Sequence, residues 1–258
     1  MDQSDAKNYL QSEQSFFSLI EDYFRDSSSS YTEKMHAFPR FVPRQALSYF
    51  LARNEIFKEI IPLHGSILDF GIYRGSSFFT WLQLSSLYEP YNHLRKIIGF
   101  DSFQGFSALS KNDQSTESET FGLKRQEGMM FHGGDEELQR GIKLYNLNRP
   151  LGHVNKAQVI KGDLPSTCAD YLQAHPETII AMANFGLGLH EPTREILTLI
   201  KPRLQNGSIL VFEDLNQAMW PDETAALFKV FGADEISLQR IPYCPHLSWM
   251  PVGGKGKG

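Results

Sequence analysis

The segment 67–77, with the sequence ILDFGIYRGSS, constrains the fold more than any other part of the chain. It is a short apolar run that contains an acid and continues through two glycines into a helical pattern. A parallel strand that enters a glycine-rich turn brings backbone close to a ligand, and the following helix presents free N–H groups there. The segment therefore predicts a cofactor loop, with candidate ligands Asp69, Gly71, Gly75, Ser76 and Ser77.

The spacing of the glycines separates two classes of cofactor. Dinucleotide-binding proteins use G-x-G-x-x-G, in which the middle glycine leaves room for a pyrophosphate. Here Tyr73 stands between Gly71 and Gly75. This argues against a nicotinamide-dependent oxidoreductase and favours S-adenosylmethionine, which carries no phosphate. Tyr73 itself either lines an acceptor pocket or packs against an N-terminal helix.

A second strand pattern, residues 96–100, also ends in an acid. Asp101 follows Gly71 by 30 residues and is placed to accept hydrogen bonds from both hydroxyls of a ribose. Ser102 comes directly after it, and the ring of Phe103 could lie beside an adenine. Either segment alone could be an ordinary loop turn, but their order and spacing together favour a cofactor site.

Composition limits the partners and the compartment. The 258 residues carry a net charge of −5, with Lys and Arg scattered, so we expect a neutral or cationic small-molecule acceptor and no nucleic acid. Cys168 and Cys244 fit no zinc or C-x-x-C spacing, which indicates a reducing cytoplasm. The chain has no apolar run of membrane-spanning length and no basic start typical of a signal peptide. We expect a cytoplasmic protein without a membrane partner.

Strand and helix patterns alternate along the chain, which indicates an α/β fold with a mostly parallel sheet covered by helices on both faces. We expect five parallel strands near 66–70, 96–100, 157–161, 178–184 and 207–213. A closing antiparallel pair is expected near 234–240 and 246–250, for seven strands in total. The helices are expected near 76–88, 135–146, 166–174, 191–203 and 222–231.

Two regions lie outside this alternation. Residues 1–62 form an expected helical extension, with one helix near 5–24 and another that begins at Pro43, separate from a cofactor-binding domain at 63–258. The extension should pack on that domain or on a second subunit. The polar stretch 107–135 directly follows the proposed ribose acid, so we interpret it as a substrate lid or as disorder.

Several blocks between about residues 38 and 228 together resemble the macrocin-type sugar O-methyltransferases. They read FVPRQAL at 41–47, GIYRGSS at 71–77, GFDSFQGF at 99–106, KGD at 161–163, HEPT at 190–193 and WPDET at 220–224. The resemblance implies a class I methyltransferase fold, S-adenosylmethionine as cofactor and a homo-oligomer. It also implies a small-molecule acceptor, a hydroxyl of a sugar or glycosylated natural product.

The resemblance assigns parts of the cofactor to particular residues. Residues 69–77 would surround the methionine end, Asp101 the ribose, and Gly162 with Asp163 the adenine. Arg44 would either reach the methionine carboxylate or form a surface ion pair.

The chain departs from the family at the end of the expected fourth strand. Where the family has two aspartates in D-x-D-L-Y-E-P-T, this chain has Gly186 and Gly188. In the family an acid here joins an acidic pair, represented by Glu213 and Asp214, to hold a magnesium ion. Two carboxylates on one strand end are a poor cage for a hard cation, so we predict no metal.

Without a metal, another group must remove the acceptor proton. His190 takes the place of the family's tyrosine and is the first candidate for general base, with His132 and Asp214 as alternatives. A histidine at a helix start could equally be a capping or surface residue. Two further readings stay open: an N-methyltransferase, and a paralogue that binds the cofactor without catalysis.

Overall fold

In a computed structural model of the chain, the described residues are 11–106, 113, 128, 130, 134–218 and 220–253. The chain forms two compact units, residues 1–49 and 50–258. The second unit therefore takes in most of helix α3 (Arg44–Ile60), which the sequence had grouped with the extension. Most of the expected lid at 107–135, including His132, lies outside the described residues.

The first unit contains α1 (Gln11–Asp26), α2 (Tyr31–His36) and the short 3₁₀ helix η2 (Phe38–Arg40). The sequence analysis did not predict α2, because the four serines at 27–30 that precede it are also typical of polar linkers. Ser30 instead caps this helix: its hydroxyl accepts from the Glu33 backbone N–H at 3.3 Å, and the Glu33 carboxylate accepts from the Ser30 N–H at 2.7 Å. Such a reciprocal capping box satisfies N–H groups that a helix start leaves without partners.

The second unit is built on a seven-stranded sheet in the order β3-β2-β1-β4-β5-β7-β6. The first five strands run parallel, and β7 is antiparallel to both of its neighbours. This confirms the class I methyltransferase sheet. The strands are β1 (Ser66–Phe70), β2 (Ile97–Asp101), β3 (Ala157–Lys161), β4 (Ile180–Phe185), β5 (Leu204–Phe212), β6 (Gln239–Ile241) and β7 (Cys244–Pro251).

The expected strand at 234–240 was wrong over most of its length, since β6 begins only at Gln239. Gly232 and Glu235 form a turn instead: the Glu235 N–H donates to the Gly232 carbonyl, and the Glu235 carboxylate accepts from the Gly232 N–H, both at 2.9 Å. A side chain that bonds to nearby backbone in this way competes with strand pairing.

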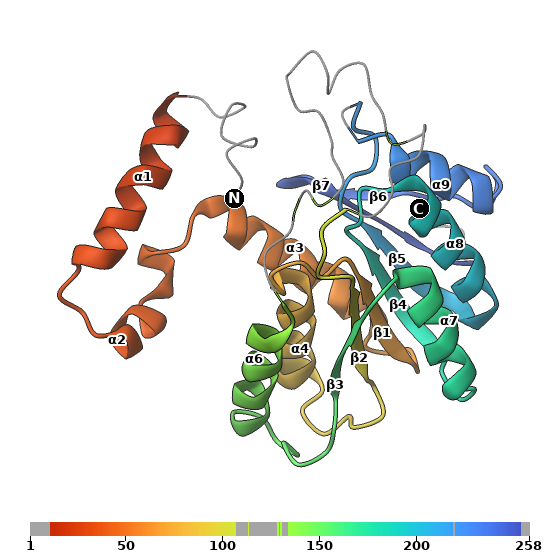
Figure 1. Cartoon of the computed structure of the whole chain (residues 1–258), viewed down its shortest axis with the longest axis horizontal. Coiled ribbons are helices and arrows are strands. Elements are labelled where there is room, and N and C mark those ends of the chain that lie inside the picture. The colour runs from red at the N-terminus through yellow and green to blue at the C-terminus, as the bar shows by residue number, and fades with distance from the viewer. Residues whose placement is uncertain are drawn as a thin grey trace. The chain divides into compact units, whose positions relative to one another are not determined.

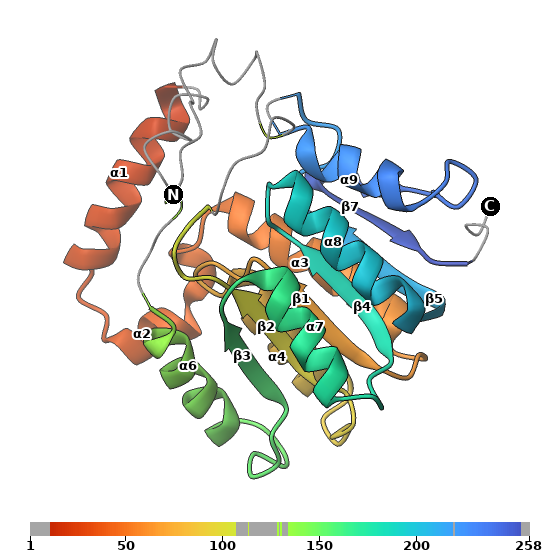
Figure 2. The same ribbon diagram turned by 45° about the vertical axis from the view of Figure 1, so that its right-hand side comes forward.

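Helices cover both faces of the sheet. In Figures 1 and 2, α4 and α6 lie on one face, and α7, α8 and α9 lie on the other. Their bounds are α4 (Ser76–Tyr88), α6 (Glu136–Leu147), α7 (Leu164–Ala174), α8 (His190–Ile200) and α9 (Asp222–Val230). The helix expected at 191–203 ends at Ile200, because Lys201–Arg203, with Pro202 inside it, continues as the 3₁₀ helix η4.

Four phenylalanines, which we call the phenylalanine ladder, cross the sheet near the carboxyl ends of its central strands. Phe100, Phe70, Phe185 and Phe212 are register neighbours on β2, β1, β4 and β5, and none is exposed. Their successive ring centroids are 4.9, 5.3 and 5.1 Å apart in stacked geometry. The loops that leave these strands therefore start from one continuous apolar layer.

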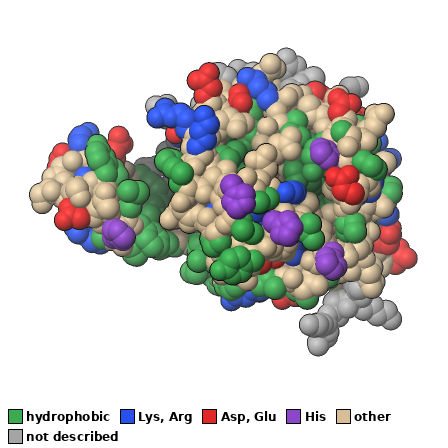
Figure 3. Space-filling view, turned by 90° about the horizontal axis from the view of Figure 1, so that it is seen from below, with side chains coloured by type: hydrophobic (Ala, Val, Ile, Leu, Met, Phe, Trp, Pro, Cys, Tyr) green, Lys and Arg blue, Asp and Glu red, His purple; other side chains and the backbone are tan. Residues whose placement is uncertain are grey.

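Figure 3 shows the molecule from below relative to Figure 1. Basic, acidic, histidine and apolar side chains are interspersed on the surface seen in this view. Among the described residues, no helix combines the length and the apolar character needed to cross a bilayer.

Candidate functional site

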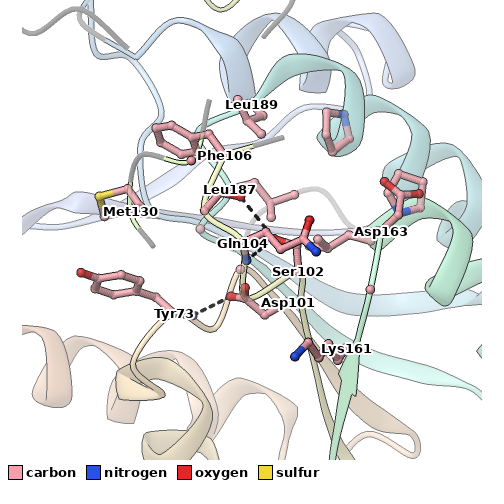
Figure 4. Close-up of a pocket in the computed structure, with 18 residues that line it drawn as sticks. Tyr73, Asp101, Ser102, Gln104, Phe106, Met130, Lys161, Asp163, Leu187 and Leu189 are labelled. Carbon is pink, nitrogen blue, oxygen red and sulfur yellow. Dashed lines mark hydrogen bonds between the residues drawn. The ribbon is translucent and has the colours of Figure 1, made fainter. Parts of the chain in front are cut away.

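A cavity of about 550 Å³ lies at the carboxyl ends of β1 to β4. Strand order reverses between β1 and β4, and open α/β sheets bind ligands at such a switch point. Figure 4 shows Tyr73 and Asp163 on opposite sides of this cavity, with Asp101 and Ser102 between them. Six of the predicted cofactor residues line it: Gly71, Tyr73, Asp101, Ser102, Gly162 and Asp163.

Asp101 joins two of the loops that form the cavity. Its carboxylate accepts from the Tyr73 N–H and from the Phe103 N–H, each at 2.8 Å and each on a different oxygen. Tyr73 and Phe103 both have positive φ angles, 48° and 54°, in the left-handed region that non-glycine residues rarely adopt. The carboxylate stabilises both turns and so fixes the wall of the cavity.

Gly71 is required where the loops after β1 and β4 touch. Its φ is +80°, and a Cβ on it would lie 2.5 Å from the carbonyl oxygen of Gly186. Gly75, with φ +84°, is the residue that precedes α4. No larger residue fits at position 71 without moving backbone, which explains the first glycine of the motif.

The remaining cofactor candidates differ in position. Asp69, Gly75, Ser76, Ser77 and Phe103 are not among the residues that line the cavity. Phe103 is 3% exposed, with the Lys161 ammonium 5.9 Å from its ring centroid. Asp163 lines the cavity and also begins α7, where it accepts from the Ser166 N–H at 3.2 Å. Arg44 belongs to the first unit.

A set of hydrogen-bonded polar side chains, the Arg53 network, lies beside the cavity and consists of the buried Arg53, Asp69 and Asn184 together with the partly exposed Glu213. The Asn184 amide donates to Asp69 at 2.8 Å and to Glu213 at 3.2 Å, and the Arg53 guanidinium donates to Glu213 at 2.8 Å. Burial raises the pKa of Asp69 to about 7, although hydrogen bonds from Asn184 and Ser77 oppose the shift. The network joins the ends of β1, β4 and β5.

Glu223, at the start of α9, holds the turn after β4. One of its carboxylate oxygens accepts from the Leu187 N–H at 2.9 Å and from the Gly188 N–H at 3.2 Å. The side chain is fully buried, so desolvation, with the nearby Asp214 charge, raises its pKa well above the usual range. Since Leu187 lines the cavity, Glu223 supports the cavity wall from behind.

Neither described candidate base lines the cavity. His190 is 7% exposed; its backbone N–H donates to Asp113 at 2.7 Å, and its Nδ1 lies 3.1 Å from a Glu191 oxygen. The Asp214 carboxylate accepts from the Gln217 amide at 3.1 Å. The structure thus brings several cofactor candidates together but does not bring His190 or Asp214 to the same cavity.

Three residues that organise this region were missed by the sequence analysis: Arg53, Asn184 and Glu223. Asn184 had a signal, because it is the one amide in the otherwise apolar strand IAMANF. A polar side chain in a fully buried strand needs a hydrogen-bonding partner. Arg53 and Glu223 looked like ordinary charged positions on helices.

The comparisons with known proteins agree with the fold. The chain is similar to a crystal structure of CalS11, a calicheamicin methyltransferase, with a TM-score of 0.90, 29% identity and coverage of 96% of this chain and 95% of the other. The apo structure of CalS11, described as a TDP-rhamnose 3′-O-methyltransferase, matches with a TM-score of 0.82, 28% identity and coverage of 96% and 97%.

The O-methyltransferase NovP is more distant, with a TM-score of 0.58, 15% identity and coverage of 80% and 79%, and it supports the fold alone. No protein-family model matches the chain, and no curated protein matches its sequence. The likeness to CalS11 over nearly the full length identifies the chain as an O-methyltransferase with the class I fold. It also implies S-adenosylmethionine as the methyl donor.

Proposed function

We propose that the second unit binds S-adenosylmethionine in the 550 Å³ cavity and transfers its methyl group to a hydroxyl of a sugar or glycosylated natural product. The observation that carries this proposal is the pairing of the Gly71 turn with Asp101 across one cavity, in a chain that is 29% identical to CalS11.

The cavity offers different chemistry to each part of the cofactor. The Asp101 carboxylate already accepts two N–H groups, but a carboxylate has about four acceptor positions and can also accept from ribose hydroxyls. Asp163, at the far side, would accept from the adenine amine. The methionine end would lie toward the turn at 71–77, with Arg44 as a further candidate for its carboxylate.

The reaction is an in-line displacement at a sulfonium carbon, so the protein must align the acceptor and remove its proton. We keep His190, His132 and Asp214 as the candidate bases. We also keep a homo-oligomer and a cytoplasmic location within the proposal, together with two alternatives: N-methylation, and cofactor binding without catalysis.

Calorimetric titration with S-adenosylhomocysteine tests the cofactor part. We expect one site per chain, and Asp101→Ala should weaken binding at least about tenfold, because it removes the ribose acceptor and releases two left-handed turns. Asp170→Ala, at an exposed position on α7, is the matched control and should bind like the wild type. A wild-type protein that does not bind would refute the cofactor assignment.

Methyl transfer from labelled S-adenosylmethionine tests the acceptor part. TDP-rhamnose, the substrate named for CalS11, is the first acceptor to try, paired with a TDP-amino sugar that distinguishes transfer to oxygen from transfer to nitrogen. Binding of the cofactor without transfer to any sugar would favour the non-catalytic alternative.

A further inference from the structure

The guanidinium of Arg53 places a positive charge between the carboxyl ends of β4 and β5, a region that we call the β4–β5 corner. Arg53 is 3% exposed, and its Nη2 donates to Glu213 Oε1 at 2.8 Å while Nη1 lies 3.4 Å from the Ser76 hydroxyl. Its helix is held against α4, where the rings of Phe57 and Tyr88 stack at 6.1 Å. The guanidinium is therefore delivered from a packed helix and has little freedom to leave.

The carboxylate of Glu213 accepts hydrogen bonds from two buried side chains. The same oxygen, Oε1, accepts from Arg53 and from the Asn184 amide at 3.2 Å. The side chain of Glu213 is 23% exposed and that of Arg53 only 4%, so this ion pair is largely shielded from water. A carboxylate that already has a fixed cationic partner gains less from binding a second cation.

The magnesium ion that the sequence resemblance implies does not fit the side chains present. Mg²⁺ requires about six oxygen ligands in near-octahedral geometry at about 2.1 Å. At the end of β4, Gly186 and Gly188 supply no side chain, although a Cβ on Gly186 would lie only 3.4 Å from the Glu213 carboxyl carbon. Among the described residues, no three or more His, Cys, Asp or Glu side chains form a group that could hold a metal.

We propose that Arg53 is the resident cation of this corner, a positioning residue that holds Glu213 in place, and that methyl transfer proceeds without a divalent ion there. The proposal rests on the proposed function for its catalytic part. Its structural part, that the guanidinium replaces a dissociable metal ion, stands on the Arg53 and Glu213 geometry alone.

Manganese binding tests the structural part without any turnover. The full-length protein, with and without S-adenosylhomocysteine, is titrated with Mn²⁺, and free Mn²⁺ is measured by electron paramagnetic resonance. We expect no stoichiometric site at millimolar Mn²⁺. One tight Mn²⁺ per chain that Glu213→Gln abolishes would overturn the proposal. Failure of the proposed function would appear separately, as absent binding of S-adenosylhomocysteine in calorimetry.

A designed gain of metal binding gives a second test. Arg53→Met combined with Gly186→Asp removes the guanidinium and adds a carboxylate next to Glu213, so we expect Mn²⁺ affinity to rise at least tenfold over wild type. Arg53→Met combined with Gly186→Asn is the matched control without the added charge. A folded double variant that gains no affinity contradicts the claim that Arg53 occupies the place of a cation.

The positioning role is tested by kinetics once an acceptor is found. We expect wild-type kcat to be unchanged by a chelator, and Arg53→Met to lower kcat at least tenfold. Arg53→Lys should recover most of this loss, because it keeps the charge. Loss of wild-type activity on chelation, restored by Mg²⁺, would overturn the proposal, as would equal kcat values for the Lys and Met variants.

Discussion

The two faces of the sheet differ most at its carboxyl end. On one face the phenylalanine ladder stacks ring on ring across four strands. On the other face the Arg53 network joins the ends of three of these strands, β1, β4 and β5, by hydrogen bonds. Asp69 directly precedes Phe70 on β1, and Asn184 directly precedes Phe185 on β4. Because successive residues on a strand point to opposite faces of the sheet, the polar side chains lie on one face and the rings on the other.

This contrast indicates that the ladder holds the strands together, whereas the network positions polar groups at the site. Apolar contacts are non-directional, so the ladder can hold the strands together without fixing the direction of any polar group. The Arg53 network is directional, and the loss of one member leaves a buried donor or acceptor without its partner. The face that carries the network is therefore where small changes should alter the site.

The largest expected loss of stability comes from opening the ladder. Phe185 has no exposed surface and stacks on two other rings, so Phe185→Ala should lower the free energy of unfolding by about 3–5 kcal/mol. Urea denaturation measures the change. Phe228→Ala, at a position that is 54% exposed, is the control and should cost much less. Similar losses in the two variants would contradict a continuous ladder.

Removal of the amide at the centre of the polar network should cost less. Asn184→Ala deprives Asp69 and Glu213 of a common donor, and we expect a loss of about 2 kcal/mol in unfolding free energy. The exposed Asn155→Ala is the matched control. Unlike the ladder variant, Asn184→Ala should also weaken cofactor binding in calorimetry; unchanged binding would separate the network from the site.

The pH dependence of stability sharpens the comparison, because the Arg53 network contains a fully buried acid, Asp69, whereas the phenylalanine ladder contains no titratable group. The native Asp69 carboxyl keeps its proton to about pH 7, whereas the unfolded one ionises near 3.8. Rising pH therefore ionises the unfolded state first, and wild-type stability should fall relative to Asp69→Asn by about 1.4 kcal/mol per pH unit between about pH 5 and 7. Denaturation of both proteins across this range measures the slope. A constant difference would refute the raised pKa.

The smallest effect is expected at Gly186, directly after the ladder. A Cβ there would be at ordinary contact distance, 3.4 Å or more from its neighbours, so Gly186→Ala should change stability by less than about 1 kcal/mol. Gly71→Ala, whose Cβ would lie 2.5 Å from a carbonyl oxygen, should be far more destabilising. Thermal unfolding of the two variants checks whether the two touching loops differ in this way.

Much of the fold followed from local pattern. The short patterns at 66–70 and 157–161 predicted β1 and β3 with their observed bounds, although β1 is buried along its whole length and β3 is a partly exposed edge strand. The cavity-lining positions of Gly71 and Asp101 also followed, since strand ends in a parallel sheet meet at one edge.

The Arg53 network could not be predicted in this way. Arg53 and Glu213 are 160 residues apart in the chain, and neither has a neighbouring residue that reveals its partner. The α2 helix was missed for a related reason: Ser30 and Glu33 form a recognisable capping box, but the serines around Ser30 are also typical of linkers.

The phenylalanine ladder has a practical consequence for redesign. Each of its rings is followed directly by a residue of the functional region: Gly71, Asp101, Gly186 and Glu213. On each of four strands, one peptide bond therefore separates a residue that packs in the core from a residue of the functional region. Loops that replace 101–106 or 186–189 would reshape the wall of the cavity while every strand retains its native packing partner.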